Sequence, residues 1–362
     1  MIVRSQFGGD SSLRTHSAVK TVVLLAIVTW FLAGSPPAGA SSKETANDTV
    51  VIRFPDGIDV PWEVQELLLQ RVTESIRYVE DFFGYAFPRR IEYQFIESRY
   101  WGIGSAGYPN IVRDPWPVPT SIEDPSLCRP FNPHEVVHLV NHAIWHLCAV
   151  DSMDEGFAWL VQNLYLGRPL HYEASGLLAL GELPPLRTLL LESSQISRFR
   201  YLVASRGNSS FLGFLYERFG HRSVIRLHRG LAEICGEGRF SDNLISLVEK
   251  CTSTPIAQLE VEWHKVLRAI QVHPRYLTAL RLYKEYDEAD LLRLVRQCEW
   301  LDVEIDPAFM AEVRSLNSDI WSYVNNESLN EEELRARIEQ IVKWAEEIRR
   351  GISDRHTTGS PA

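Results

Sequence analysis

The segment from Asn132 to Leu160, NPHEVVHLVNHAIWHLCAVDSMDEGFAWL, constrains this chain more than any other part of its sequence. It holds four histidines within thirteen positions, and an acidic pair, Asp154 and Glu155, precedes an apolar run. Asn132 and Pro133 are typical of a helix start, so the histidines are expected on one helix and the acidic pair near the start of a second. The segment predicts a helix pair that either carries a metal site or is simply rich in histidine.

Two of the histidines have the spacing of a zinc-ligand pair. His134 and His138 are four residues apart, so on a helix both side chains project from one face, about one turn from each other. Glu135 follows the first histidine directly. A His-Glu-x-x-His pattern therefore predicts two zinc ligands with a general base beside them.

The other two histidines, His142 and His146, continue the same helix face but suit a ligand role less well. Positions 134 and 142 lie about 12 Å apart along a helix axis at 1.5 Å per residue, too far to bind one ion together. The pair at 138 and 142 has no glutamate after its first histidine. We expect His142 and His146 to support the site from behind or to pack in the core.

A catalytic zinc ion needs a third protein ligand and one open position. Glu155 lies seventeen residues after His138, and the intervening chain is long enough to fold back over that distance. The alternative is that Glu155 caps its own helix, because Ser152 to Glu155 is also a capping-box pattern. Gly156 favours the ligand role, since a glycine in a first turn costs about 0.5–1 kcal/mol and is better explained by the close approach of another element.

The rest of the chain predicts an α+β fold. A small N-terminal mixed sheet with a long helix is expected first, then the zinc-site helix pair, then a mostly α-helical C-terminal part. The predicted strands are 50–55, 89–98 and an edge strand within 105–114, and the predicted long helix is 61–84. Further helices are predicted at 152–166, 173–196, 209–219, 221–236, 241–250 and 256–270.

The first forty residues are predicted to be a signal peptide. Basic residues precede the apolar run at 21–33, which is shorter than the ~20 residues of a membrane-spanning helix. Ala38 and Ala40 offer small side chains at the two positions that a signal peptidase reads. We predict cleavage after Ala40 and a secreted or periplasmic protein with no membrane span, and an uncleaved membrane anchor is the alternative.

Length and charge set the domain organisation and exclude one class of partner. The chain has 362 residues, 45% of them hydrophobic, so it can bury a large core. Its formal net charge is −10 and no long basic run is present, so nucleic acid is not an expected partner. The predicted divisions are a signal peptide (1–40), a linker (41–50), a main domain that carries the predicted zinc site (51–270), a helical extension (271–351) and a disordered tail (352–362).

Five cysteines suit an exported protein that carries a few bridges. Cys128 and Cys148 flank the histidine helix, while Cys235 and Cys251 flank a shorter loop and helix. Each pair is predicted to form a disulfide, with free buried thiols as the alternative. Cys298 is left without a predicted partner.

These motifs resemble the gluzincin clan of zinc metallopeptidases, and within it the peptidase-MA-like superfamily. HEVVH is similar to the clan's zinc-helix motif, and DEGFAWL to the Glu-Gly-x-Ala helix that follows it. Looser likeness at 183–189, 208–220 and 240–267 extends the resemblance over roughly 50–270. The resemblance implies a thermolysin-like catalytic core in which His134, His138 and Glu155 bind Zn²⁺ and Glu135 activates the zinc-bound water.

The same resemblance implies a peptide or protein substrate and assigns Tyr201 as the hydroxyl donor that steadies the oxyanion. No Gly-Ala-Met-Glu-Asn signature is present in the sequence, so aminopeptidase activity is not expected. Two rival functions stay open. A catalytically idle, peptidase-like binding protein would use the cleft or the helical tail to hold a partner. A purely structural zinc ion would have no open coordination position, and its removal would unfold the chain.

Overall fold

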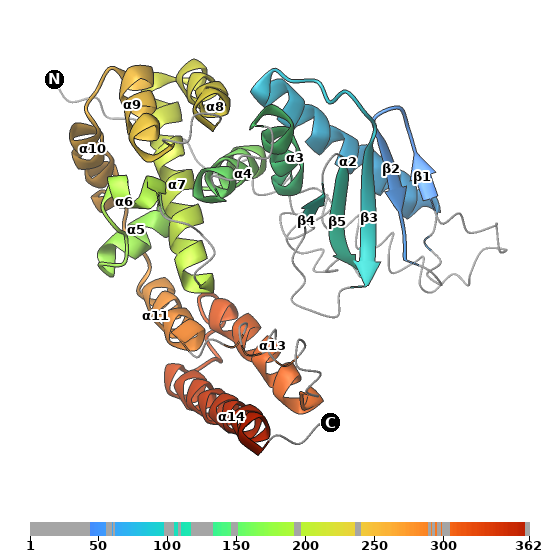
Figure 1. The fold of residues 1–362 in the computed structure, drawn as a ribbon, viewed down its shortest axis with the longest axis vertical. Coiled ribbons are helices and arrows are strands. Elements are labelled where there is room, and N and C mark those ends of the chain that lie inside the picture. The colour runs from blue at the N-terminus through green and yellow to red at the C-terminus, as the bar shows by residue number, and fades with distance from the viewer. Residues whose placement is uncertain are drawn as a thin grey trace, which may run out of the picture.

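The structure is a computed structural model. It describes residues 44–55, 60, 62–97, 105–107, 110–116, 133–145, 151–191, 197–235, 240–288, 291, 294, 298 and 305–358. The predicted signal peptide and its cleavage site, Cys128, Cys148 and His146 lie outside these residues. The described part has the expected α+β class, with a small mixed sheet on one side of a mainly helical molecule (Figure 1).

The sheet has five strands in the order β1-β2-β3-β5-β4. β2, β3 and β5 run parallel, and the outer strands β1 and β4 are antiparallel to their neighbours. Helix α2 connects β2 to β3, as a parallel crossover requires. The strand bounds are β1 (Glu44–Ala46), β2 (Val50–Arg53), β3 (Ile91–Glu97), β4 (Ser105–Gly107) and β5 (Ile111–Trp116), and α2 is Trp62–Phe83.

Two parts of the sheet differ from the prediction. The predicted edge strand is a hairpin, in which β4 and β5 pair with each other and β5 also pairs with β3. The predicted linker contains β1, because the Asn47 side chain accepts hydrogen bonds from the N–H groups of Thr49 and Val50 and so turns the chain back onto β2. An Asx turn of this kind is a common use of asparagine between strands.

Helix α2 covers the sheet with one apolar stripe. Val72, Ile76 and Val79 are fully buried and follow helical spacing. The helix ends before Gly84, whose φ of 58° is available to glycine at little cost. Leu68 is buried, but the preceding Leu67 is 49% exposed and lies outside this stripe.

In the described part of residues 134–268, eight helices build the centre of the molecule. They are α3 (His134–Trp145), α4 (Asp151–Leu166), α5 (Tyr172–Ala179), α6 (Leu186–Leu191), α7 (Arg198–Phe219), α8 (His221–Cys235), α9 (Phe240–Thr252) and α10 (Ile256–Arg268). Helix α3 packs against β4 and β5 on one side and against α4 and α8 on others. The sheet therefore supports the histidine helix from behind, while α4 faces it (Figure 1).

Two predicted helix boundaries were wrong. The predicted helix at 173–196 is interrupted, because Gly181 adopts a φ of 73° after α5 and Pro184 and Pro185 precede α6. Helix α7 begins at Arg198, ahead of the predicted start at 209. Its N-cap is Ser197, whose side chain accepts a hydrogen bond from the Arg200 N–H.

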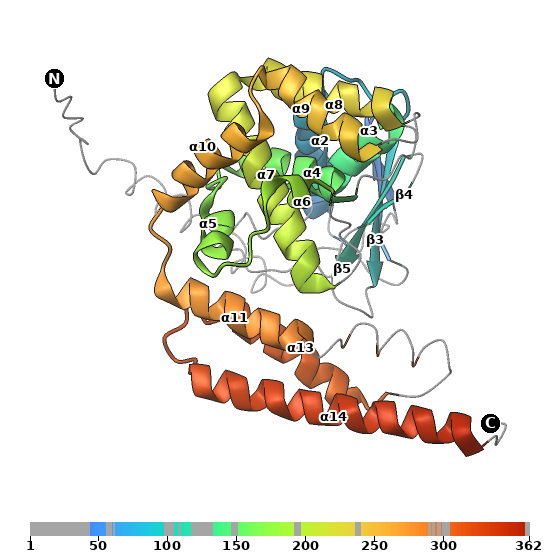
Figure 2. The same cartoon turned by 60° about the vertical axis from the view of Figure 1, so that its left-hand side comes forward.

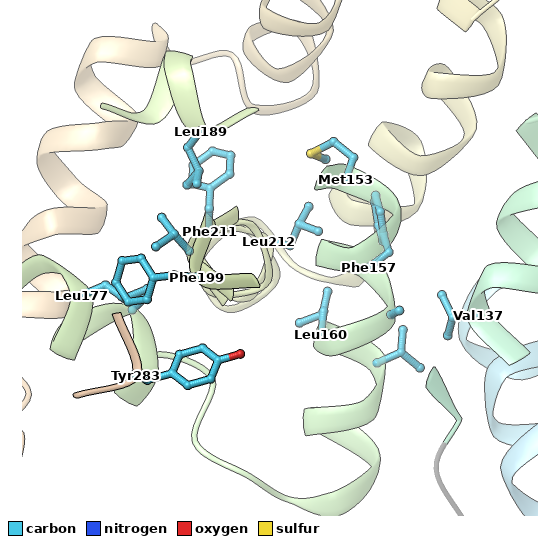
Figure 3. Close-up of a cluster of buried hydrophobic side chains, with 14 of the residues drawn as sticks. Val137, Met153, Phe157, Leu160, Leu177, Leu189, Phe199, Phe211, Leu212 and Tyr283 are labelled. Atoms are coloured by element: carbon cyan, nitrogen blue, oxygen red, sulfur yellow. The ribbon is translucent and has the colours of Figure 1, made fainter. Parts of the chain in front are cut away.

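Helices α4 and α7 cross closely in the middle of the core (Figure 3). A Cβ atom added at Gly156 would lie 2.8 Å from the Asn208 Cβ, so only glycine permits this approach. Phe157 and Leu160 of α4 and Leu212 of α7 are buried around the crossing. The prediction that Gly156 marks a close approach of another element is confirmed. This close contact between α4 and α7 fixes the position of the neighbouring Glu155.

The C-terminal helices α11 (Pro274–Glu288), α13 (Pro307–Ser322) and α14 (Glu331–Thr358) form a layer beneath the central helices (Figure 2). Leu334, Ile338, Ile341 and Ala345 of α14 are buried, so the apolar stripe of this helix packs within the fold. The predicted disordered tail from 352 was wrong as far as Thr358, because Ile352 continues the buried face of α14.

Cys251 is a free thiol, so the predicted bridge to Cys235 is absent. Helices α8 and α9 are consecutive, and Arg226 donates a hydrogen bond to the Cys251 carbonyl. Cys235 lies nine residues further along α8, which corresponds to about 13 Å at 1.5 Å per residue. Two cysteines at opposite ends of a helical hairpin are too far apart for a disulfide.

A membrane crossing finds no support in the described part of the chain, where every helix is too short or too polar to span a bilayer.

Candidate metal centre

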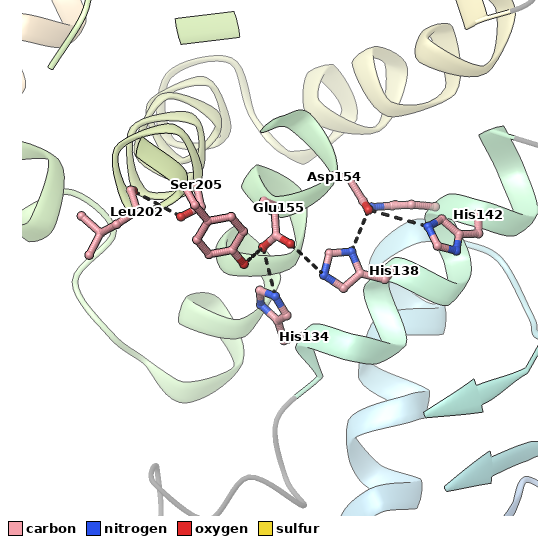
Figure 4. Close-up of polar contacts among 9 residues, drawn as sticks. His134, His138, His142, Asp154, Glu155, Leu202 and Ser205 are labelled. Atoms are coloured by element: carbon pink, nitrogen blue, oxygen red, sulfur yellow. Dashed lines mark hydrogen bonds and ion pairs between the residues drawn. The ribbon is translucent and has the colours of Figure 1, made fainter. Parts of the chain in front are cut away.

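Helices α3 and α4 bring three donor side chains together (Figure 4). His134 and His138 lie one turn apart on α3, and Glu155 faces both of them from α4. His134 Nε2 is 3.3 Å from Glu155 Oε2, and His138 Nε2 is 3.5 Å from Glu155 Oε1. One ligand atom from each residue lies within 4.8 Å of the others. We call these three residues the ligand cluster.

The donor set of the ligand cluster fits a zinc ion. Two imidazole nitrogens and one carboxylate oxygen are a common catalytic zinc set, with bonds of about 2.0–2.2 Å. Donor atoms around a tetrahedral ion at that bond length are about 3.3–3.6 Å apart, which matches the two measured contacts. His134 and His138 are buried. The three side chains that the sequence predicted as ligands could therefore hold one ion away from bulk water.

The second histidine of the cluster is supported from behind by Asp154. Asp154 Oδ2 forms an ion pair with His138 Nδ1 at 2.8 Å. The same oxygen is 3.8 Å from His142 Nε2. Because a carboxylate at Nδ1 leaves Nε2 to face a metal, Asp154 has the position of a group that orients a ligand. His142 takes the supporting place predicted for it.

A hydrogen-bond chain continues from Asp154 into the core. Asn141 Nδ2 donates to Asp154 Oδ1 at 2.6 Å, and Asn141 Oδ1 accepts from His228 Nε2 at 2.7 Å. Asn141 and His228 are both essentially unexposed. His228 is enclosed by the rings of Phe83, Trp145 and Phe157, and burial lowers its pKa to about 3, with a further contribution from the Arg229 charge.

Sequence reasoning missed both members of this chain. Asn141 lies three residues after His138, on the same helix face, so the helical spacing was a signal that could have indicated it. His228 lies far along the chain on α8 and follows no motif. Only the packing of α8 against α3 brings it to Asn141.

The local field of the cluster favours a positive charge. Burial opposes a charged His138, but the carboxylates of Asp154, Glu155 and Glu135 outweigh it and raise the pKa of His138 to about 10. Burial likewise opposes ionisation of Glu155, but the hydrogen bond and charge of His134, with His138 and Tyr201, lower its pKa to about 2. A cation, whether a proton or a metal ion, is therefore favoured between these groups.

Glu135 and Tyr201 both lie beside the ligand cluster. Glu135 is partly exposed on the first turn of α3, and its charge acts on both His138 and the Tyr201 hydroxyl. The Tyr201 hydroxyl donates a 2.5 Å hydrogen bond to Glu155 Oε2. Burial, and then the Glu155 charge and this hydrogen bond, raise the pKa of Tyr201 far above its usual value, so the hydroxyl keeps its proton.

The capping-box alternative for Glu155 does not hold. Helix α4 begins at Asp151, so Glu155 lies beyond the N3 position of a capping box. Ser152 Oγ makes its hydrogen bond to the Leu190 carbonyl of α6 instead. The Glu155 carboxylate contacts His134, His138 and Tyr201, all of them outside its own helix.

No protein-family model matches this chain, and a search of curated proteins finds no match either.

Proposed function

We propose that this protein is a secreted, zinc-dependent metallopeptidase with a thermolysin-like arrangement of its central part. His134, His138 and Glu155 hold the zinc ion, and Glu135 is the general base. The observation that carries the proposal is the convergence of both histidine Nε2 atoms on the two oxygens of one carboxylate. A histidine-rich helix without a metal site would have no reason to direct two buried rings at one point.

The chemistry divides between the metal and the chain's own side chains. Zinc, when bound, supplies a Lewis acid that polarises a peptide carbonyl and lowers the pKa of a water to about 7. Glu135 takes the proton of that water and passes it to the leaving amine. The Tyr201 hydroxyl, protonated at neutral pH, donates a hydrogen bond to the oxyanion of the substrate after leaving Glu155. Asp154 keeps the proton of His138 on Nδ1, so Nε2 stays a metal ligand.

The test combines metal analysis with the variant Glu135→Gln. The variant removes the base and leaves the ligand cluster intact, so it should keep one equivalent of zinc and lose about 10²–10⁴-fold in kcat on a peptide library. Glu217→Gln is the matched control, because Glu217 contacts a different histidine, His171, and should keep both zinc and turnover. A chelator should abolish turnover of the wild type.

Other outcomes separate the rival functions. Purified protein without stoichiometric zinc would overturn the metal site. Bound zinc with no peptide cleavage would favour a catalytically idle binding protein. Unfolding on chelation, with no exchangeable ligand on a cobalt-substituted site, would indicate a structural ion. Turnover retained by Glu135→Gln would remove the general-base assignment and leave the metal site standing.

A further inference from the structure

An arginine lies beside the ligand cluster without belonging to it. The guanidinium carbon of Arg206, on α7, is 3.1 Å from the centre of the Trp159 ring. The Trp159 ring in turn packs edge to face against His134, with ring centres 4.8 Å apart. The distance from the guanidinium carbon of Arg206 to the centre of the His134 ring therefore cannot exceed the sum of these two distances. That reach corresponds to about two residues of extended peptide.

The ion pair of Arg206 leaves part of its guanidinium group available for a second carboxylate. Glu173 of α5 binds Arg206 Nε at 2.7 Å, and among the described residues it is the one carboxylate paired with this arginine. The Arg206 side chain is 18% exposed and that of Glu173 is 40% exposed. A guanidinium held by a carboxylate at Nε still presents two Nη groups, which match the two oxygens of a second carboxylate.

The charge of Arg206 contrasts with its surroundings. The groups that act on His138 are the carboxylates of Asp154, Glu155 and Glu135. Arg206 is close enough to act on the Tyr201 hydroxyl as well. A substrate carboxylate approaching the ligand cluster meets repulsion from these acidic groups and attraction from the Arg206 guanidinium.

We propose that Arg206, held on the Trp159 ring and by Glu173, binds a carboxylate of the substrate within about two residues of the hydrolysed bond. The inference rests on the proposed peptidase function and adds a substrate class to it: peptides cleaved close to a free C-terminus, or next to an acidic side chain. Trp159 fixes the plane of the guanidinium, and Glu173 fixes its rotation, so little order is lost when the carboxylate binds.

Arg218, on the same helix, is a control for the possibility that Arg206 has a purely structural role. Arg218 also lies over aromatic rings, those of Phe214 and Phe219, and also pairs with a glutamate, Glu262. Both of its aromatic partners lie on α7 itself, and among the described residues their rings pack against each other and against Phe211, not against the ligand cluster. If Arg206 only braced the helices, its substitution would act as that of Arg218 does.

The experiment compares matched peptides on the wild type, Arg206→Gln, Arg206→Lys and Arg218→Gln. Each peptide is prepared with a free C-terminal carboxylate, as the C-terminal amide, and as an amide carrying one added Glu side chain near the cleaved bond. Binding is measured on each protein in the Glu135→Gln background, and turnover on each without that change. The wild type should prefer one of the two carboxylate forms by about 10- to 100-fold, and which form it prefers identifies the source of the carboxylate.

Arg206→Gln should lose that preference with the amide peptide unchanged, mostly through KM. Arg206→Lys should keep part of the preference, because it retains charge without the fork. Arg218→Gln should behave as the wild type. A wild type with no carboxylate preference, or a preference that survives Arg206→Gln, overturns the proposal. Absence of turnover with a binding preference that depends on Arg206 would instead remove the peptidase function and leave the carboxylate site.

Discussion

Two histidine clusters contact helix α7 at different positions along its length. Both combine histidine and glutamate side chains, but they arrange the donor atoms differently. In the ligand cluster, two rings direct Nε2 at the single carboxylate of Glu155, which Tyr201 of α7 also binds. In the second, His171 contacts Ser210 Oγ with Nδ1 at 2.9 Å and Glu217 Oε2 with Nε2 at 3.0 Å. We call His171, Ser210 and Glu217 the His171 cluster.

The His171 cluster has the residue types of a serine hydrolase triad but not its access. Ser210 is fully buried, and its hydroxyl already accepts a hydrogen bond from Trp263 Nε1 at 3.1 Å. Glu217, which would have to be the buried orienting acid, is 54% exposed. A nucleophile must reach a substrate and its acid must be held in place, so this cluster joins α7 to the loop before α5 and α7 to α10 as a brace.

The difference between the clusters is one of direction. Each ring nitrogen of His171 faces a separate partner, so every polar group is satisfied in pairs and no common point remains. The donor atoms of the ligand cluster converge on one point, where only a cation can satisfy all of them together. Convergence, and not the number of histidines or acids, distinguishes a metal site from a buried polar brace.

Removal of a ligand histidine should separate the two clusters most strongly. His138→Ala should weaken zinc binding by more than about 100-fold, because loss of a direct ligand exceeds the 10–100-fold cost of losing a supporting group. His171→Ala should lower the free energy of unfolding, since it removes one of the two buried hydrogen-bond partners of the Ser210 hydroxyl, yet keep zinc affinity. Competition with a chelator of known affinity measures the first, and urea unfolding the second. Equal zinc affinity in the two variants would end the distinction.

How far the sequence could anticipate this site depends on the distance over which each signal acts. His134, Glu135 and His138 are tied by helix periodicity, which is local and strong. Glu155 required a long fold-back, yet Gly156 carried the packing requirement in its own identity. The chain from Asp154 through Asn141 to His228 depends on the docking of α8, and nothing in the sequence near residue 228 encodes that docking.

The fold follows the same rule. The parallel strands and α2 were predictable because their periodicity is local. The break between α5 and α6 was missed although Gly181 and two prolines marked it, because the apolar pattern runs on through the turn. The Cys235–Cys251 bridge was wrong because adjacency in sequence says nothing about which ends of two helices meet. Where a helix ends, and which ends of two helices lie together, depend on helix length and on which side chains are buried, and no sequence motif specifies them.

Loss of the group behind a ligand should have the next largest effect. Asp154→Asn removes the charge at His138 Nδ1 and should weaken zinc binding by about 10–100-fold with the fold retained. Glu217→Gln makes the equivalent change behind His171 and should leave zinc affinity unaltered, because no metal depends on that ring. Zinc titration followed by chelator competition provides the measurement. An Asp154→Asn protein with unchanged affinity would show that Asp154 serves packing alone.

Glycine substitutions beside each cluster should separate packing from ligand geometry. Gly156→Ala places a Cβ 2.8 Å from the Asn208 Cβ, and Gly213→Ala places one 3.1 Å from the Leu170 Cβ, near His171. Both should destabilise the fold, by about 1–3 kcal/mol for Gly156→Ala and less for Gly213→Ala. Only Gly156→Ala should also weaken zinc binding, because pushing α4 away from α7 moves Glu155. Equal zinc affinity in both proteins would uncouple that crossing from the site.

The last expected effect concerns His228, at the inner end of the hydrogen-bond chain, and it appears as a pH dependence of folding and not as a change in zinc binding. Its pKa is about 3 in the folded chain against an ordinary value of 6.5. A depressed histidine pKa means that the unfolded chain binds the extra proton first, so stability is complete above pH 6.5 and falls as the pH drops below it. The folding equilibrium should lose up to about tenfold per pH unit between pH 6.5 and 4.5.

That pH window isolates His228 from the ligand cluster. The stabilising contribution of Glu155, whose pKa is lowered to about 2, is lost only as the pH falls below its ordinary value of 4.5. His138, with its pKa raised to about 10, contributes fully below 6.5. Burial also lowers the pKa of His264, so this residue adds a pH dependence of stability in the same direction. The contribution of His228 is therefore obtained by comparing metal-free wild type with His228→Gln. The variant should be less stable at pH 7 and have a shallower slope in urea unfolding from pH 6.5 to 4.5. If the pH dependence of stability were unchanged in the variant, His228 would take up its proton in the folded protein. The inner end of the hydrogen-bond chain from Asp154 would then be open to water.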